Sequence, residues 1–199
     1  YSYGATAAQP LEVVASWNSL PYLVKDSKIQ DRWYHSPLYG KALMQGVKVD
    51  QQSNLYVTTA RWGGADIPAT LSKLKKVNGE YVLTPFPSEQ LNDVDNPQGL
   101  KAVLGFEIDR NNTMWILDQG HVAGQPTKPG DEKLILWDLN KNKEIQRYVF
   151  TDKDSSRTCS FLTDVAVDND SNFAYITDSG IFCNPLNGGL IVYDRVHNK

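Results

Sequence analysis

Residues 160–180 read SFLTDVAVDNDSNFAYITDSG, and this stretch decides the fold. Two runs rich in β-branched and aromatic residues, 161–168 and 173–177, stand on either side of a polar turn of Asn, Asp and Ser. Short apolar runs separated by such residues are typical of a β-hairpin. The stretch therefore predicts two antiparallel strands, and the same pattern occurs more than once in the chain.

The hairpin pattern returns at residues 46–61, GVKVDQQSNLYVTTAR, and at residues 104–120, LGFEIDRNNTMWILDQG. In each hairpin an acid closes the first strand and a polar turn follows it. These acids are spaced 59 residues apart in both intervals: Asp50, Asp109 and Asp168. Loops vary in length, so an equal spacing found twice indicates a structural repeat rather than chance.

Each hairpin is followed by further strand-like residues, at 71–86, 134–150 and 190–199. Two hairpins make a four-stranded unit, and such units repeated along a chain are the signature of β-propeller blades. The sequence thus predicts an all-β fold with blades at about 46–86, 101–150 and 158–199. Residues 11–17, LEVVASW, are a possible closing strand of the last blade.

Three blades cannot close a ring of ordinary curvature, and an open blade edge would leave backbone groups unpaired. We therefore expect residues 1–199 to be the N-terminal half of a single six-bladed propeller domain. A second polypeptide, the C-terminal half of a cleaved precursor, is expected to complete it. A symmetry-related copy of the same half and a truncated chain are the alternatives.

Composition excludes several partners. The net charge of −3 gives no electrostatic reason to expect binding to nucleic acid or to an anionic membrane. No apolar run approaches the length of a transmembrane helix. The first residues, YSYGATAAQP, resemble a mature N-terminus left by cleavage.

The two cysteines, Cys159 and Cys183, stand just before and just after the third hairpin. Entry and exit of an antiparallel hairpin lie at the same end, so a disulfide between them is expected, against free buried thiols or a bridge to another chain. The glycosylation sequons at Asn111 and Asn169 fall in hairpin turns. Together these features favour a secreted, extracellular glycoprotein.

Propeller geometry gathers the loops that follow the second strand of every blade on one face of the disc. These loops are residues 61–66, 118–121 and 178–184, and the start of the third inner strand joins them. Polar groups that converge on a concavity make the default binding-site hypothesis. The candidate ligand-binding residues at this mouth of the central channel are Arg61, Trp62, Asp118, Gln119, His121, Asp164, Asp178 and Asn184.

Four of these eight residues also have a structural interpretation. Asp118 and Asp178 could hydrogen-bond loop amides, and Arg61 with Trp62 could be a packed cation–π pair. The three acids that close the first strands, at positions 50, 109 and 168, are expected to cap turns rather than to do chemistry.

The chain contains no established catalytic or metal-binding motif, so its catalytic residues are unknown. His121 and Asp118 are the candidates for a proton-transfer role. No cofactor is predicted, although calcium could bind to carboxylates and carbonyls of the channel.

Several segments, in this order and spacing, resemble the yellow/major royal jelly protein family. They include GVKVDQQSNLYVTTARWGGADIPATLSKL at 46–74, LGFEIDRNNTMWILDQG at 104–120, and SFLTDVAVDNDSNFAYITDSG at 160–180. The resemblance covers about residues 11–194. It departs from the family at Ala60, where a proline is usual, and at residues 96–99, where a cysteine is expected.

The resemblance implies a secreted six-bladed propeller about twice as long as this chain. Family functions differ, and fold alone does not choose among them. We expect a protein that binds a small aromatic or amine ligand at the mouth of the channel. The alternative is an isomerase of the dopachrome-converting type; a metal-dependent lactonase is a third reading, from propeller architecture alone. Whether the protein is an enzyme is left open.

Overall fold

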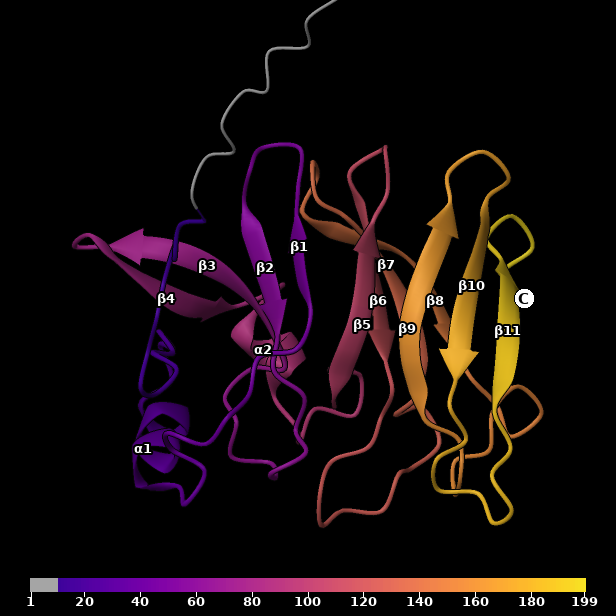
Figure 1. Cartoon of the computed structure of the whole chain (residues 1–199), viewed down its shortest axis with the longest axis horizontal. Coiled ribbons are helices and arrows are strands. Elements are labelled where there is room, and N and C mark those ends of the chain that lie inside the picture. Colours follow the sequence, from indigo (N-terminus) through magenta and orange to yellow (C-terminus); the bar gives the residue numbers. More distant parts are fainter. Residues whose placement is uncertain (1–10) are drawn as a thin grey trace, which may run out of the picture.

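The computed structural model describes residues 11–199; the expected mature N-terminus at residues 1–10 lies outside this part. Three antiparallel sheets stand side by side in chain order (Figure 1). The first sheet is formed by β1 (Val47–Val49), β2 (Leu55–Thr58), β3 (Leu71–Val77) and β4 (Glu80–Pro85). The second is formed by β5 (Val103–Ile108), β6 (Thr113–Asp118), β7 (Lys133–Asp138) and β8 (Lys143–Val149). The third is formed by β9 (Leu162–Asp168), β10 (Phe173–Asp178) and β11 (Gly189–Asp194).

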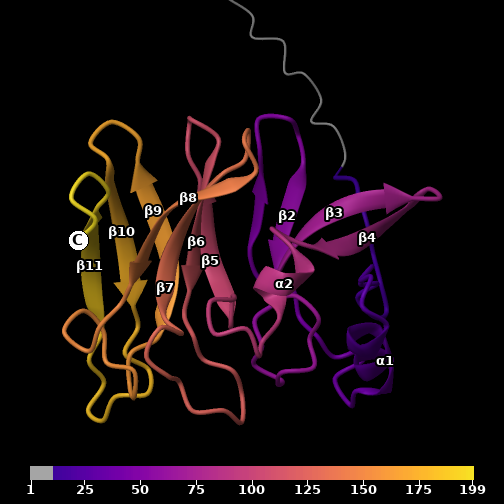
Figure 2. The ribbon, with the colours of Figure 1, turned by 180° about the vertical axis from the view of Figure 1, so that it is seen from behind.

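Within each sheet the strands follow one another in sequence order, as in a propeller blade. The first strands of the blades, β1, β5 and β9, are neighbours. The outer strand β8 lies behind them in Figure 1 and in front of them in Figure 2. The chain therefore forms three consecutive blades, which confirms the predicted all-β propeller fold.

The blades pack face to face because the middle blade is apolar on both faces. Along β6, Met114 and Ile116 join the core shared with the first blade, whereas Trp115 and Leu117 join the core shared with the third. Successive side chains of a strand point to opposite faces, so one strand serves both cores. This explains why all six residues of β6 are buried and why its sequence shows no polar alternation.

The hairpin turns at the top of Figure 1 repeat one another closely. Asp50 accepts hydrogen bonds from the backbone amides of Gln52 and Asn54, and Asp109 accepts them from Asn111 and Thr113. A left-handed residue ends each turn: Ser53, Asn112 and Asn172, with φ between 61 and 63°. It stands three residues after Asp50 and Asp109 and four residues after Asp168, because the third turn is one residue longer. The predicted turn-capping role of these acids is confirmed.

Residues 17–42 cover the outer side of the first blade. Helix α1 (Ser27–His35) buries Trp33 there, and Tyr22 forms a parallel bridge with Leu83 of β4. Residues 11–17 are not in a strand, and the partner that a closing strand requires would belong to the last blade, so that prediction stays untested. Neither α1, α2 (Glu89–Asn92) nor any other helix in residues 11–199 has the length and apolar character needed to cross a membrane.

Candidate functional site

The loops that follow β2, β6 and β10 lie together at the bottom of Figure 1, as the sequence predicts. The residues on them divide into a buried layer, which holds the loops in place, and an exposed layer, which faces outward. Arg61 and Asp118 belong to the buried layer.

Arg61 is 1% exposed, and all three of its side-chain nitrogens donate to backbone carbonyls. Nε donates to Ile67, one terminal nitrogen donates to Leu100 and Lys101, and the other donates to Asn92. Burial lowers the pKa of the guanidinium to about 10, which still leaves it charged at neutral pH. Arg61 therefore ties the first blade to the segment that enters the second, and it does not face a ligand as the sequence suggested.

Asp118 is fully buried and pairs with the buried ammonium of Lys133 at 2.9 Å. Its carboxylate also accepts hydrogen bonds from the backbone amides of Lys101, Ala102 and Gly120. Gln119, likewise buried, exchanges hydrogen bonds with the backbone of His121. The structure thus gives Asp118 the structural role that was its alternative interpretation, and it gives Gln119 a structural role as well.

Asp178 is the counterpart of Asp118 in the third blade. It accepts from the amides of Phe161 and Gly180, but Gly189 faces it where Lys133 faces Asp118. The two aspartates therefore share one loop-closing geometry, and only the one in the second blade carries a buried counter-ion.

The exposed layer is an aromatic patch contributed by all three blades: Trp62, His121, Phe161 and Phe182. Phe161 is central, with ring centroids 6.2 Å from Trp62, 6.1 Å from His121 and 5.5 Å from Phe182. The rings of His121 and Phe182 are 5.6 Å apart. Trp62 is 46% exposed and Phe182 is 56% exposed, so much of the aromatic surface is open.

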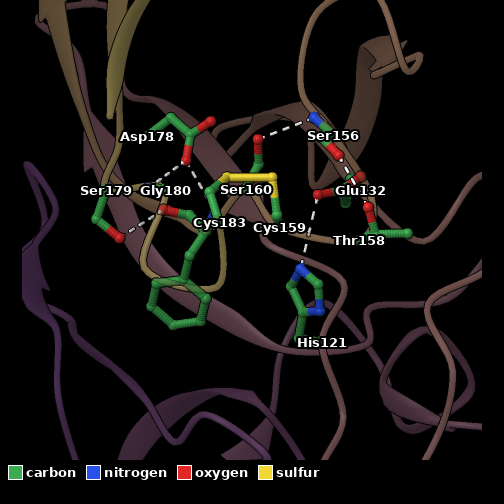
Figure 3. The surroundings of a disulfide bond; sticks show 11 residues. His121, Glu132, Ser156, Thr158, Cys159, Ser160, Asp178, Ser179, Gly180 and Cys183 are labelled. Carbon is green, nitrogen blue, oxygen red and sulfur yellow. Dashed lines mark hydrogen bonds and ion pairs between the residues drawn. A yellow bond between two sulfur atoms is a disulfide. The ribbon is translucent and has the colours of Figure 1, made fainter. Parts of the chain in front are cut away.

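A disulfide between Cys159 and Cys183 borders the patch, and His121 is among the residues around it (Figure 3). The bridge joins the segment just before Phe161 to the residue just after Phe182, and the amide of Phe182 donates to the carbonyl of Cys159. The predicted disulfide is confirmed, and it holds two rings of the patch together.

Behind His121 lies the carboxylate of Glu132, 3.8 Å from the ring Nε2 (Figure 3). The Glu132 side chain is 1% exposed, and within residues 11–199 neither of its oxygens has a hydrogen-bond partner. The other ring nitrogen of His121, Nδ1, lies 2.8 Å from the hydroxyl of Thr127.

Burial dominates the titration of this pair. It raises the pKa of Glu132 to about 7, with Asp178 adding to the effect, and it lowers the pKa of His121. Removing a charge from water disfavours the ionised form of both groups, although they would attract each other when ionised. At neutral pH His121 is therefore mainly neutral, and Glu132 is divided between its ionised and neutral forms.

Asp164 occupies a distinctive place in the repeat. The equivalent positions in the first two blades are Gly46 and Gly105, and the next blade packs directly against them. A Cβ atom on Gly105 would lie 2.6 Å from the Cα of Asp164, and one on Gly46 would lie 3.0 Å from the carbonyl oxygen of Leu104. In the third blade the same position carries an exposed carboxylate instead.

Three other predicted positions are exposed: Asn184 in the loop after β10, and the sequon residues Asn111 and Asn169 in the opposite turns. The side-chain oxygen of Asn169 accepts from the amide of Arg110. Among residues 11–199, no three side chains of His, Cys, Asp or Glu come together as a metal site would require.

Sequence reasoning missed Phe161, Phe182, Thr127 and Glu132. The two phenylalanines could have been found, because each stands within two residues of a cysteine expected to form the bridge. Glu132 gave no comparable signal: it stands beside Lys133, and an adjacent acid and base suggest a solvated pair.

Comparison with known proteins finds similarity to the major royal jelly proteins. A family model described as "Major royal jelly protein" matches residues 101–199. Major royal jelly protein 7 of Apis mellifera is 26% identical over 196 residues, covering 93% of this chain and 42% of that protein. Major royal jelly protein 8 of Apis mellifera is 22% identical over 201 residues, covering 95% of this chain and 46% of that protein.

A solved structure of a luciferin-regenerating enzyme is similar with a TM-score of 0.47 and 11% identity, covering 77% of this chain and 45% of that chain. The chain spans less than half the length of the royal jelly proteins that it matches.

The fold and the loops define the class: this is a segment of a β-propeller protein whose blades meet at an aromatic loop face. The chain belongs to the yellow/major royal jelly protein family.

Proposed function

We propose that the protein binds a small aromatic amine at the loop face of the propeller. The observation that carries this proposal is the aromatic patch itself, to which three separate blades contribute. Exposed aromatic side chains held by neighbouring loops offer ring surfaces on which a planar ligand can stack. The disulfide and the buried Arg61 and Asp118 networks fix the loops, so the patch is largely preformed.

Asp164 is the best candidate for the partner of the ligand's ammonium group. Asp118 is already paired with Lys133, and Asp178 closes its own loop. Asp164 is exposed on β9, three residues beyond Phe161, which corresponds to about 10 Å of extended chain. Gly46 and Gly105, at the same position of the other blades, lie against the next blade, so Asp164 stands where the third blade would meet a fourth.

The test is calorimetric titration of the protein with dopamine, with serotonin and with catechol as the neutral analogue. We expect heat of binding for the amines and weaker binding for catechol. Asp164→Asn should weaken amine binding about tenfold and leave catechol binding unchanged, because one charge-assisted contact is lost. Glu107→Gln is the matched control, since Glu107 also lies on an inner strand but is paired with Lys48. No heat with any ligand would refute the proposal.

An isomerase of the dopachrome-converting type is the second candidate. The observation that favours it is that His121 lies within the patch with the buried Glu132 behind it. A proton carrier whose pKa is near ambient pH suits the movement of a proton within an aromatic ligand.

We further infer that the protein is secreted and glycosylated. A disulfide is typical of oxidising compartments, and both sequon asparagines are exposed in turns on the face opposite the patch. Peptide mapping after treatment with a glycosidase checks this: Asn111 and Asn169 should convert to aspartate, and unmodified peptides would contradict it.

We propose that a second polypeptide completes the ring, as the C-terminal half of a cleaved precursor. Apolar side chains are exposed on the free faces of both end blades: Val47 and Val49 on β1, Leu190 and Val192 on β11. In the blades that do have neighbours, the equivalent surfaces are buried. Intact-mass measurement of everything that copurifies should reveal a second chain of similar size; a single chain of this mass alone would contradict the proposal.

A further inference from the structure

Three polar side chains form a line that runs inward from the loop face. The hydroxyl of Thr127, which is half-buried, lies 2.8 Å from Nδ1 of His121. On the other side of the ring, Nε2 lies 3.8 Å from the carboxylate of Glu132. The His121 ring is thus held between a hydroxyl near the surface and an acid that is 1% exposed.

This arrangement has no counterpart in the other blades. In the strand register, the position of Glu132 is taken by Gly188 in the third blade and by Ala69 in the first. Gly188 has no side chain and Ala69 is buried, so the structure of a blade does not require an acid at this position. A buried carboxylate with both oxygens unpaired costs stability, and such a cost is commonly tolerated at functional sites.

We propose that Thr127, His121 and Glu132 form a proton relay for the ligand of the aromatic patch, with Glu132 as the buried acid/base. This inference rests on the proposed ligand site and on the isomerase candidate, and it names the residues that would move a proton from one atom of the bound aromatic to another.

The proton inventory balances without any oxidant or reductant. The ligand gives a proton to the oxygen of Thr127 while the hydroxyl proton of Thr127 passes to Nδ1 of His121. The proton on Nε2 then passes to the Glu132 carboxylate. The reverse sequence returns a proton to a different ligand atom, so the electron pairs of the ligand shift and its composition stays the same. The gap of 3.8 Å between His121 and Glu132 must shorten for the transfer, as catalytic hydrogen bonds do when a substrate binds.

The groups around Glu132 bring its pKa close to neutral pH. The charged groups that act on the pair are Asp118, Asp131, Asp152, Arg157 and Asp178. Burial has the largest effect on Glu132. The carboxylates of Asp178, Asp152 and Asp118 add to it and Arg157 opposes it, so the pKa of Glu132 rises to about 7. Since burial also lowers the pKa of His121, neither group holds the proton strongly at neutral pH.

The first test needs no ligand. The chain has three histidines, so the ring nitrogens of His121 can be followed by NMR against pH, with the exposed His35 and His197 as internal references. In the wild type we expect the His121 signals to report a second step near pH 7, from Glu132. That step should vanish in Glu132→Gln and persist in Glu107→Gln. Identical His121 curves in wild type and Glu132→Gln would overturn the relay.

The second test follows proton transfer directly, with an aminochrome as the probe. Glu132→Gln and Thr127→Val should each slow its isomerisation about a hundredfold, a typical loss for acid/base catalysis, while Glu107→Gln keeps the wild-type rate. Wild-type rates in both relay variants, or no isomerisation by the wild type above buffer, would overturn the inference. Amine binding measured by calorimetry can survive either result, so the binding proposal fails or stands separately.

Discussion

Arg61→Met is expected to lower the free energy of unfolding by about 4 kcal/mol or to prevent folding, because four buried carbonyls lose their donor. Each unsatisfied buried group costs about 1–3 kcal/mol, and methionine fills the space without supplying a hydrogen bond. The loss falls at the junction between the first two blades, where Leu100 and Lys101 enter β5.

Urea denaturation measures this effect, with Arg32→Met as the matched control. Arg32 is 40% exposed and 4.0 Å from Asp66, so its replacement should change the free energy of unfolding by less than about 1 kcal/mol. An Arg61→Met protein as stable as Arg32→Met would contradict the structural role of Arg61 and reopen the question of ligand contact.

Asp118→Asn is expected to lower the free energy of unfolding by about 3–5 kcal/mol, because it leaves the ammonium of Lys133 buried and uncompensated. The amide oxygen of asparagine can still accept from the amides of Ala102 and Gly120, which both donate to Oδ1, whereas the amide of Lys101 donates to Oδ2, the oxygen that pairs with Lys133. Most of the loss therefore comes from the ion pair rather than from the loop geometry.

The repeat supplies the control for this prediction. Asp178→Asn changes the equivalent residue of the third blade, where Gly189 stands in place of Lys133, so the loss should be only about 1 kcal/mol. Equal losses in the two variants, measured by urea denaturation, would show that loop closure and not the buried ion pair sets the stability here.

The architecture could be predicted from the sequence because it is repetitive. The turn acids Asp50 and Asp109 recur at a fixed spacing, and each turn is a local structure that its own residues determine. The disulfide also followed from local geometry, since Cys159 and Cys183 flank one hairpin. Features that depend on residues close together in the chain can therefore be predicted from the sequence.

The site was harder to predict because burial depends on neighbouring blades. Arg61 and Asp118 read as exposed loop residues, yet the packing of the first blade against the second encloses both. Conversely, Phe161 and Phe182 were not among the candidate site residues, yet both lie partly exposed, since no side chain of the described blades covers them completely. Trp62 and His121 were placed on the correct loops, while the acid behind His121 came from the far end of the same long loop, between β6 and β7, where no local pattern connects the two residues.

The aromatic patch is the proposed ligand site, and variants of two adjacent residues test this proposal most directly. Phe182 and Ile181 are almost equally exposed, at 56% and 57%, but only Phe182 packs against Phe161 and His121. In calorimetric titrations with dopamine, Phe182→Ala should weaken binding about tenfold through loss of aromatic stacking, and Ile181→Ala should leave it unchanged. Equal affinities in the two variants, or an effect confined to Ile181→Ala, would contradict the account.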